Sequence, residues 1–149
     1  MTDVVPPSPD DGTGPAALTL RLVARGRATP ELAWERYARP ALWSTWSPQI
    51  TGVELPPRLV AGAGGVVHGV GGLRLDVEVG DVDAAGRTWT WWVALARPRV
   101  PGVRMRLDHG VLAPAGGGST TTLALTGPAP VVLAYAPAAW VALRRLVRP

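Results

Sequence analysis

The sequence VRMRLDHG at residues 103–110 alternates between apolar and charged side chains until it reaches the histidine. A period of two is typical of a β-strand that buries one face and leaves the other in water. Residues 73–79 repeat the pattern, with leucines and valines alternating with charged side chains. Turn-forming glycines and prolines separate further strand-like segments between residues 59 and 118. The central part of the chain therefore predicts an antiparallel meander.

Helical segments are expected on both sides of this meander. A first strand over residues 18–23 is followed by Thr29, a suitable N-cap, with a proline next to it in the first turn of a helix. Pro40 ends or kinks that helix, and residues 41–46 form a second short helical piece. Near the C-terminus, the apolar spacing within residues 137–147 predicts an amphipathic closing helix, whose arginines lie at the end where they complement the helix dipole.

These elements predict an α+β protein. A curved antiparallel sheet of about six or seven strands surrounds a long C-terminal helix, and two short helices follow the first strand. With 149 residues in the chain, of which 47% are hydrophobic, residues 16–149 are expected to form a single domain with one core. Residues 1–15 are rich in proline and aspartate, and we expect a disordered tail there rather than a signal peptide.

Several local motifs carry a resemblance to a known family. Together with the order of elements, they resemble the helix-grip architecture of the START/Bet v1-like superfamily (SRPBCC), in particular its polyketide cyclase/dehydrase-like members from actinobacteria. The motifs are Trp34-Glu35-Arg36-Tyr37, Trp43 to Pro48, Gly69 to Leu73, Trp89 to Trp92, His109-Gly110-Val111 and Gly127-Pro128. The resemblance covers residues 16–148. It implies a cavity between the sheet and the closing helix, and a function like those of aromatic polyketide cyclases, lipid and hormone binders or chaperone activators.

His109 is the candidate catalytic residue, because it continues the inward register of Val103, Met105 and Leu107. An imidazole in the cavity can act as a general acid or base, or it can form a hydrogen bond with a ligand carbonyl. A hydrogen-bonded core histidine near a strand end explains the same pattern. Arg36 and Arg39 lie near the same helical turn, and an inward arginine there would polarise a carbonyl. More often such arginines are simply exposed to solvent.

The expected ligand contacts are aromatic and apolar side chains that face the cavity. Tryptophan rings stack on polycyclic ligands, and tyrosines offer a phenolic donor. The tryptophans are also expected as packing residues, because the chain contains no phenylalanine. Trp92 is expected on the opposite face of its strand from Trp89 and Trp91. The predicted ligand contacts are Tyr37, Trp43, Trp46, Met105, Leu107, Tyr135, Trp140 and Leu143.

The composition argues against several other classes of protein. The chain has no cysteine, and His68 and His109 lie on distant strands without an inward carboxylate, so we expect neither a metal site nor a cofactor. The net charge is only +4, and the polar faces of the strands carry both arginines and acidic residues, so nucleic-acid binding is not expected. No apolar run reaches the roughly 18 residues of a membrane span. We expect a cytoplasmic monomer or homodimer that does not insert stably into membranes.

Three functions remain open at this point. The first is binding of a small hydrophobic ligand, such as a polyketide or a lipid, without reaction. The second is a cyclase or dehydratase-like enzyme that uses His109 with an arginine or a tyrosine. The third is a co-chaperone or protein-interaction role, or association with a membrane surface through Trp140 and the C-terminal arginines. The mainly apolar character of the inward positions favours the first.

Overall fold

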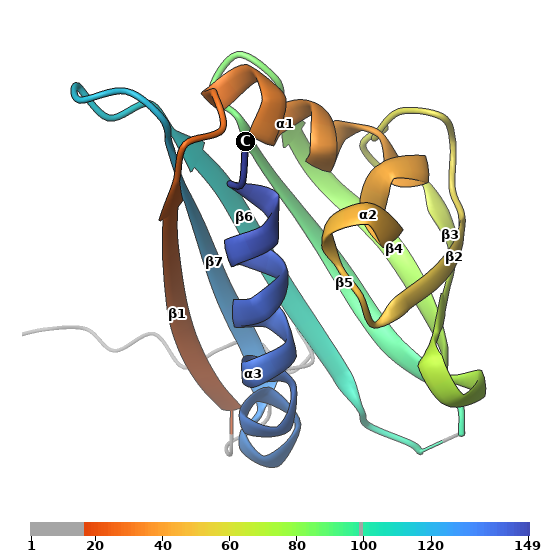
Figure 1. Cartoon of the computed structure of the whole chain (residues 1–149). Helices are drawn as coiled ribbons and strands as arrows, with labels where there is room; N and C mark the ends of the chain where they lie inside the picture. Colours follow the sequence, from red (N-terminus) through yellow and green to blue (C-terminus); the bar gives the residue numbers. More distant parts are fainter. Residues whose placement is uncertain (1–16, 99) are drawn as a thin grey trace, which may run out of the picture.

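The computed structural model describes residues 17–98 and 100–149 and contains one antiparallel sheet of seven strands. The predicted tail of residues 1–15 lies outside the described residues. The strand order is β1-β7-β6-β5-β4-β3-β2, so the first strand pairs with the last (Figure 1). The strands are β1 (Ala17–Gly26), β2 (Ile50–Glu54), β3 (Gly64–Gly69), β4 (Arg74–Asp83), β5 (Thr88–Arg97), β6 (Arg104–Leu112) and β7 (Ser119–Pro128).

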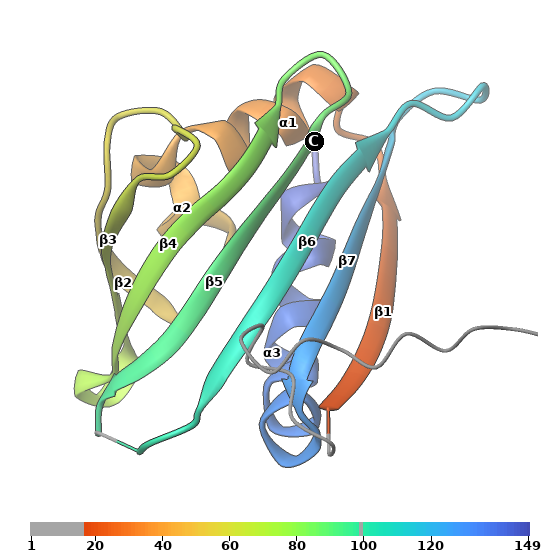
Figure 2. The ribbon, with the colours of Figure 1, turned by 180° about the vertical axis from the view of Figure 1, so that it is seen from behind.

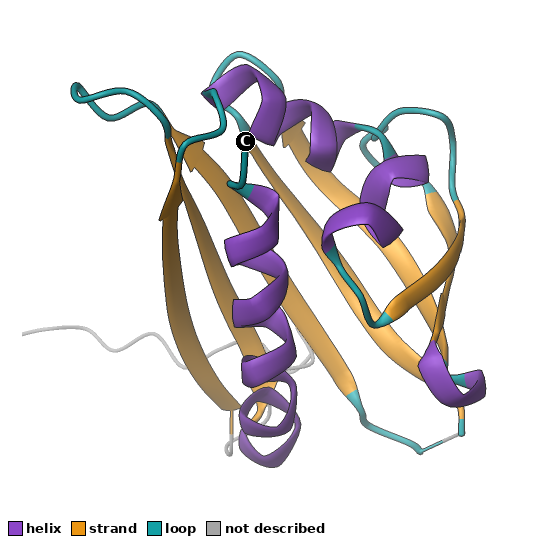
Figure 3. Ribbon diagram, in the orientation of Figure 1, coloured by secondary structure: helices purple, strands orange, loops and turns teal. Residues whose placement is uncertain are grey.

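The three α-helices lie on one side of this sheet. In Figure 3 the purple helices are in front of the orange strands, and Figure 2 shows the sheet from behind, with α3 on its far side. The helices are α1 (Pro30–Ala38), α2 (Trp43–Trp46) and α3 (Ala129–Leu146), with short 3-10 turns at η1 (Pro40–Leu42) and η2 (Val70–Gly72). This arrangement is the α+β helix-grip fold that the sequence predicts.

The start of α1 follows from its sequence. The Thr29 side chain accepts a hydrogen bond from the backbone N–H of Leu32 at 3.1 Å, so the predicted N-cap is confirmed. The helix buries Trp34 and Tyr37 against the sheet and ends at Ala38, two residues before Pro40. A proline at that position cannot continue the hydrogen-bond pattern of the helix, so the chain changes direction there.

The closing helix is longer than its sequence pattern predicts. The predicted span of residues 137–147 is wrong at its start, because α3 already begins at Ala129 and Pro137 lies inside it. A proline within a helix removes one backbone hydrogen bond and crowds the preceding turn, which costs roughly 3 kcal/mol. Packing of α3 against β1 and β7 offsets that cost, and such tertiary packing is invisible to a local pattern.

The C-terminal end of α3 is held in place by two elements that are distant in sequence. The Arg36 guanidinium donates to the backbone carbonyls of Leu146 at 2.6 Å and Arg148 at 2.5 Å. The N–H of Ala28 donates to the carbonyl of Val147 at 3.0 Å. Arg36 therefore caps a helix, and the expectation that it polarises a ligand carbonyl in the cavity is wrong.

The outer face of the sheet carries charges of both signs. Ion pairs form along single strands, between Arg106 and Asp108 at 3.0 Å and between Arg74 and Asp76 at 3.8 Å. As predicted, Trp92 lies on this face, where the Arg104 guanidinium stacks 4.6 Å from its ring. Exposed pairs of this kind contribute less than about 1 kcal/mol each. The outer face is therefore a solvated surface, and the organised apolar space lies on the other side of the sheet.

Candidate ligand cavity

A cavity of about 520 Å³ lies between the inner face of the sheet and α3. It also borders α2 and the first residue of β2. Its lining is almost entirely apolar and consists mainly of aromatic rings, larger aliphatic side chains and alanines. The polar side chains that line it, apart from the tryptophan indoles, are Ser47, Gln49, His109 and Tyr135. A space of this size and character is suited to a small hydrophobic molecule.

The strand register arranges the floor of this cavity in rows. His109 pairs with Trp89 on one side and with Leu123 on the other, and the next inward row is Trp91, Leu107 and Leu125. Further rows follow toward the start of β6, down to Val103. Six residues of strand separate His109 from Val103, which corresponds to roughly 20 Å. The floor is therefore long and apolar, with its histidine near one end.

The His109 imidazole is held by aromatic rings on several sides. His109 is 7% exposed, and its ring stacks on Trp89 with a centroid distance of 4.4 Å and an interplanar angle of 7°. The Tyr37 ring meets it edge-on at 4.9 Å. These contacts leave the imidazole little freedom to turn, so its orientation is fixed before any ligand arrives.

The protonation of His109 follows from its neighbours. The indole N–H of Trp91 donates to Nε2 of His109 at 3.2 Å, which places the proton of the neutral ring on Nδ1. Burial lowers the pKa of His109 from 6.5 to about 3, and the nearby Asp108 offsets this only in part. The imidazole is therefore neutral at physiological pH. Within residues 17–98 and 100–149, its Nδ1 has no hydrogen-bond partner.

Tyr37 supports this arrangement from behind instead of lining the cavity. Its hydroxyl lies 2.7 Å from Oγ1 of Thr121, and that oxygen donates its own proton to the carbonyl of Gly110 at 3.1 Å. Tyr37 must therefore be the donor in its bond to Thr121. Burial raises the pKa of Tyr37. A phenol with its proton committed in this way is a packing and positioning group.

Gln49 and Tyr135 form a second polar pair in the lining. The side-chain amide of Gln49 donates to the Tyr135 hydroxyl at 3.4 Å, a long bond. Oε1 of Gln49 has no partner among the described residues. Burial raises the pKa of Tyr135, so its hydroxyl keeps its proton at neutral pH. Tyr135 can therefore still donate that proton to a ligand.

Most of the predicted contacts do line the cavity. They are Trp43, Trp46, Met105, Leu107, Tyr135 and Leu143, together with His109. Tyr37 lies just outside, against His109 and Trp89. The prediction for Trp140 is wrong, because this residue is 44% exposed on the outer side of α3, with the Arg144 guanidinium 4.7 Å from its ring.

The structure adds lining residues that sequence reasoning did not select. Trp89 and Trp91 face the cavity, whereas the sequence pattern assigned them to packing. Their alternation along β5 already placed them on one face, so that signal was available. Gln49, Ala139 and Ala142 also line the cavity. For a loop glutamine or a helix alanine, local sequence gives no comparable signal.

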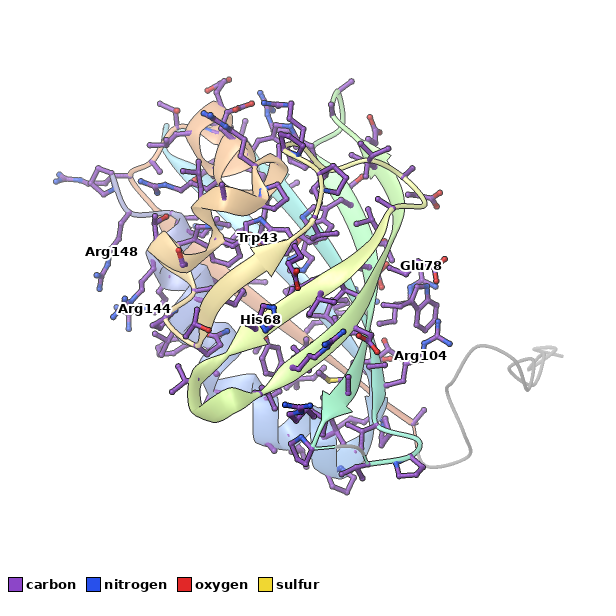
Figure 4. The ribbon with its side chains drawn as sticks, turned by 90° about the vertical axis from the view of Figure 1, so that its right-hand side faces the viewer. Trp43, His68, Glu78, Arg104, Arg144 and Arg148 are labelled. Carbon is purple, nitrogen blue, oxygen red and sulfur yellow. The ribbon has the colours of Figure 1, made fainter. Side chains whose placement is uncertain are left out.

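The other histidine belongs to the surface. His68 is 44% exposed and lies 2.9 Å from the Glu54 carboxylate on the neighbouring strand. His68 is labelled in Figure 4 and lies on β3, next to the edge strand β2. Among the residues that the structure describes, no group of three histidine, cysteine, aspartate or glutamate side chains could hold a metal ion. In the same part of the chain, no helix is long and apolar enough to cross a membrane.

Comparison with known proteins agrees with this geometry. A family model described as "Polyketide cyclase / dehydrase and lipid transport" matches residues 19–148. The chain belongs to this family. Among solved structures, that of Ara h 8.0201 is similar, with a TM-score of 0.69 at 14% sequence identity over 87% of this chain and 95% of that one. At this identity the likeness supports the helix-grip fold of the Bet v1-like superfamily alone. No curated protein sequence matches the chain.

Proposed function

We propose that this family member binds a small hydrophobic molecule, such as a polyketide or a lipid, inside its cavity. The observation that carries the proposal is the 520 Å³ space lined by apolar and aromatic side chains in the interior of a small domain. Protein interiors are normally close-packed, and empty space of this size lacks the contacts that stabilise a core. A ligand would supply those contacts.

The polar groups of the cavity support binding more than catalysis. His109 has a strongly lowered pKa and an Nε2 lone pair already engaged by Trp91, so it is a poor general base at neutral pH. Arg36 and Tyr37, which the catalytic hypothesis would pair with it, are committed to the end of α3 and to Thr121. The groups left for a ligand are hydrogen-bonding ones, such as the Tyr135 hydroxyl.

Two measurements test this function. Native mass spectrometry of the protein from its own host, compared with the mass of the denatured chain, is expected to reveal a retained small molecule. Titration with the fluorescent probe 1-anilinonaphthalene-8-sulfonate is expected to saturate, and oleate or a fused-ring quinone is expected to displace the probe. An empty protein that also fails to bind the probe would contradict the proposal. Recovery of a chemically altered ligand would favour the cyclase-like alternative instead.

A further inference from the structure

The solvent-facing side of α3 is apolar over most of its length. Surface helices normally bury an apolar stripe and turn charged residues to water. In α3, residues 129–143 contain no charged side chain at all. The exposed residues of this stretch are Pro130, Leu133, Ala134, Pro137, Trp140 and Val141, which we call the α3 outer face. Leu133 is 59% exposed, Trp140 44% and Val141 41%, so large apolar groups stand open to solvent there.

Positive charge borders one end of this face. Arg144 and Arg145 occupy the last turn of α3 and are exposed, and Arg148 follows directly. No acidic residue occurs from residue 129 to the end of the sequence. Figure 4 shows Arg144 and Arg148 on the α3 side, opposite Glu78 and Arg104 on the outer face of the sheet. Within residues 17–98 and 100–149, none of these three arginines takes part in an ion pair.

We propose that the α3 outer face docks on the surface of an anionic lipid bilayer. The helix has 18 residues, which correspond to about 27 Å of helix along its path, so it offers an extended apolar surface to a bilayer. Apolar side chains with a tryptophan would enter the boundary between headgroups and acyl chains, and the arginines would contact the anionic headgroups. The Arg144 guanidinium over the Trp140 ring already combines both kinds of contact in one place.

Charge complementarity favours a bilayer over a second copy of this chain. Two copies that paired through the α3 outer face would each bring arginines and no carboxylate from this helix, so the interface would lack opposite charges. An anionic surface supplies them. The association is peripheral, since a helix that lies in the interface does not span the membrane.

Docking would place the cavity beside the lipid. Pro130 and Ala134 are exposed on the α3 outer face and also line the cavity. A hydrophobic molecule could then pass between the bilayer and the cavity without crossing water. This consequence rests on the proposed ligand-binding function, whereas docking itself does not.

The test is co-sedimentation of the full chain with phosphatidylcholine vesicles that contain or lack phosphatidylglycerol. Binding is expected with phosphatidylglycerol and is expected to weaken at high salt. The double variant Arg144→Gln/Arg145→Gln is expected to bind about thirtyfold more weakly, from the contribution of each arginine near an anionic surface. The double variant Leu133→Ser/Trp140→Ser is expected to lose at least about tenfold in affinity for these vesicles, because its apolar contacts with the bilayer are gone.

The outer face of the sheet offers a matched control. Trp92→Ser also removes a tryptophan that lies beside an arginine, yet on the opposite side of the molecule, so its vesicle binding is expected to equal that of the wild type. The proposal is wrong if the wild type does not bind vesicles that contain phosphatidylglycerol, or if Trp92→Ser loses as much affinity for them as the α3 variants do. A dimer in sedimentation equilibrium that Leu133→Ser/Trp140→Ser dissociates would identify a second copy as the occupant. Vesicle binding that appears only after deletion of residues 1–16 would identify the N-terminal segment as the occupant of the α3 outer face.

A separate readout keeps docking apart from ligand binding. Saturable binding of 1-anilinonaphthalene-8-sulfonate without vesicles, unchanged in Arg144→Gln/Arg145→Gln, is expected. If vesicle binding is absent while the probe still binds, docking fails and the proposed function stands. If vesicle binding is present while the probe does not bind and native mass spectrometry finds no retained molecule, the proposed function fails and docking stands.

Discussion

Replacing Ala142 by leucine is expected to stabilise the ligand-free protein while weakening ligand binding. Ala142 lies on the inner side of α3, is 3% exposed and lines the cavity. Leucine adds three carbon atoms that would extend into existing empty space. At about 0.8 kcal/mol for each buried methylene, the gain in the free energy of unfolding is up to about 2 kcal/mol. For a chain of this size, that corresponds to a rise in Tm of about 4–8 °C.

The same three carbon atoms take room from the ligand. The affinity for 1-anilinonaphthalene-8-sulfonate is expected to fall at least about tenfold, since one misplaced methylene in an apolar pocket already costs about 1–3 kcal/mol. Differential scanning calorimetry of delipidated protein and fluorescence titration measure the two effects. The matched control is Ala138→Leu, on the same helix but outside the lining, which is expected to leave the affinity unchanged.

Two results would refute this reasoning. A lower Tm for Ala142→Leu would mean that the side chain meets packed atoms instead of a void, because overpacking a filled core is destabilising. A higher Tm with unchanged affinity would mean that the void exists but that the probe binds elsewhere. The combination of higher stability and lower affinity is specific to an empty cavity that serves as the ligand site.

Three further predictions concern the scaffold around the cavity. As pH falls from 6.5 toward about 3, the unfolded chain takes up a proton at His109 that the folded chain does not. The free energy of unfolding should therefore fall by up to about 1.4 kcal/mol for each pH unit because of this residue. Urea titrations at several pH values should show this pH dependence in the wild type and not in His109→Gln. Gly26→Ala should lower stability by more than about 2 kcal/mol in the same assay, because the new Cβ would overlap the carbonyl oxygen of Val147; an unchanged midpoint would contradict this close approach. Arg36→Gln should cost about 1–3 kcal/mol, because it releases the carbonyls at the end of α3, and hydrogen exchange should show faster opening of the last turn than in the wild type.

The strands were predictable because each carries its own signal. The alternation in residues 103–109 reflects a sheet with one wet face, and the same alternation pointed His109 inward. The N-cap at Thr29 is equally local, since its bond reaches only three residues along the chain. These features depend on neighbours in sequence, so the sequence alone contains them.

The faces of α3 were not predictable in the same way. Trp140 and Leu143 lie three residues apart, which is consistent with one shared helix face. The structure instead buries Val132, Ala139 and Leu143 and leaves Trp140 outside. Because residues 129–143 are apolar all round, there is no polar stripe to mark the solvent side. On the inner side, Ala139 and Ala142 line the cavity, and their small side chains leave room for it.

The sequence by itself therefore determined the sheet, the order of its elements and the inward direction of His109, through periodicity and capping within short segments. The tertiary structure decided which side of the apolar closing helix is buried. It also decided the protonation of His109 and the roles of Arg36 and Tyr37. Each of these depends on a partner that is distant in sequence. His109 contacts Trp91 on the neighbouring strand, and Arg36 binds the carbonyl of Leu146 near the end of the sequence. Burial and such long-range hydrogen bonds arise only when the chain closes on itself.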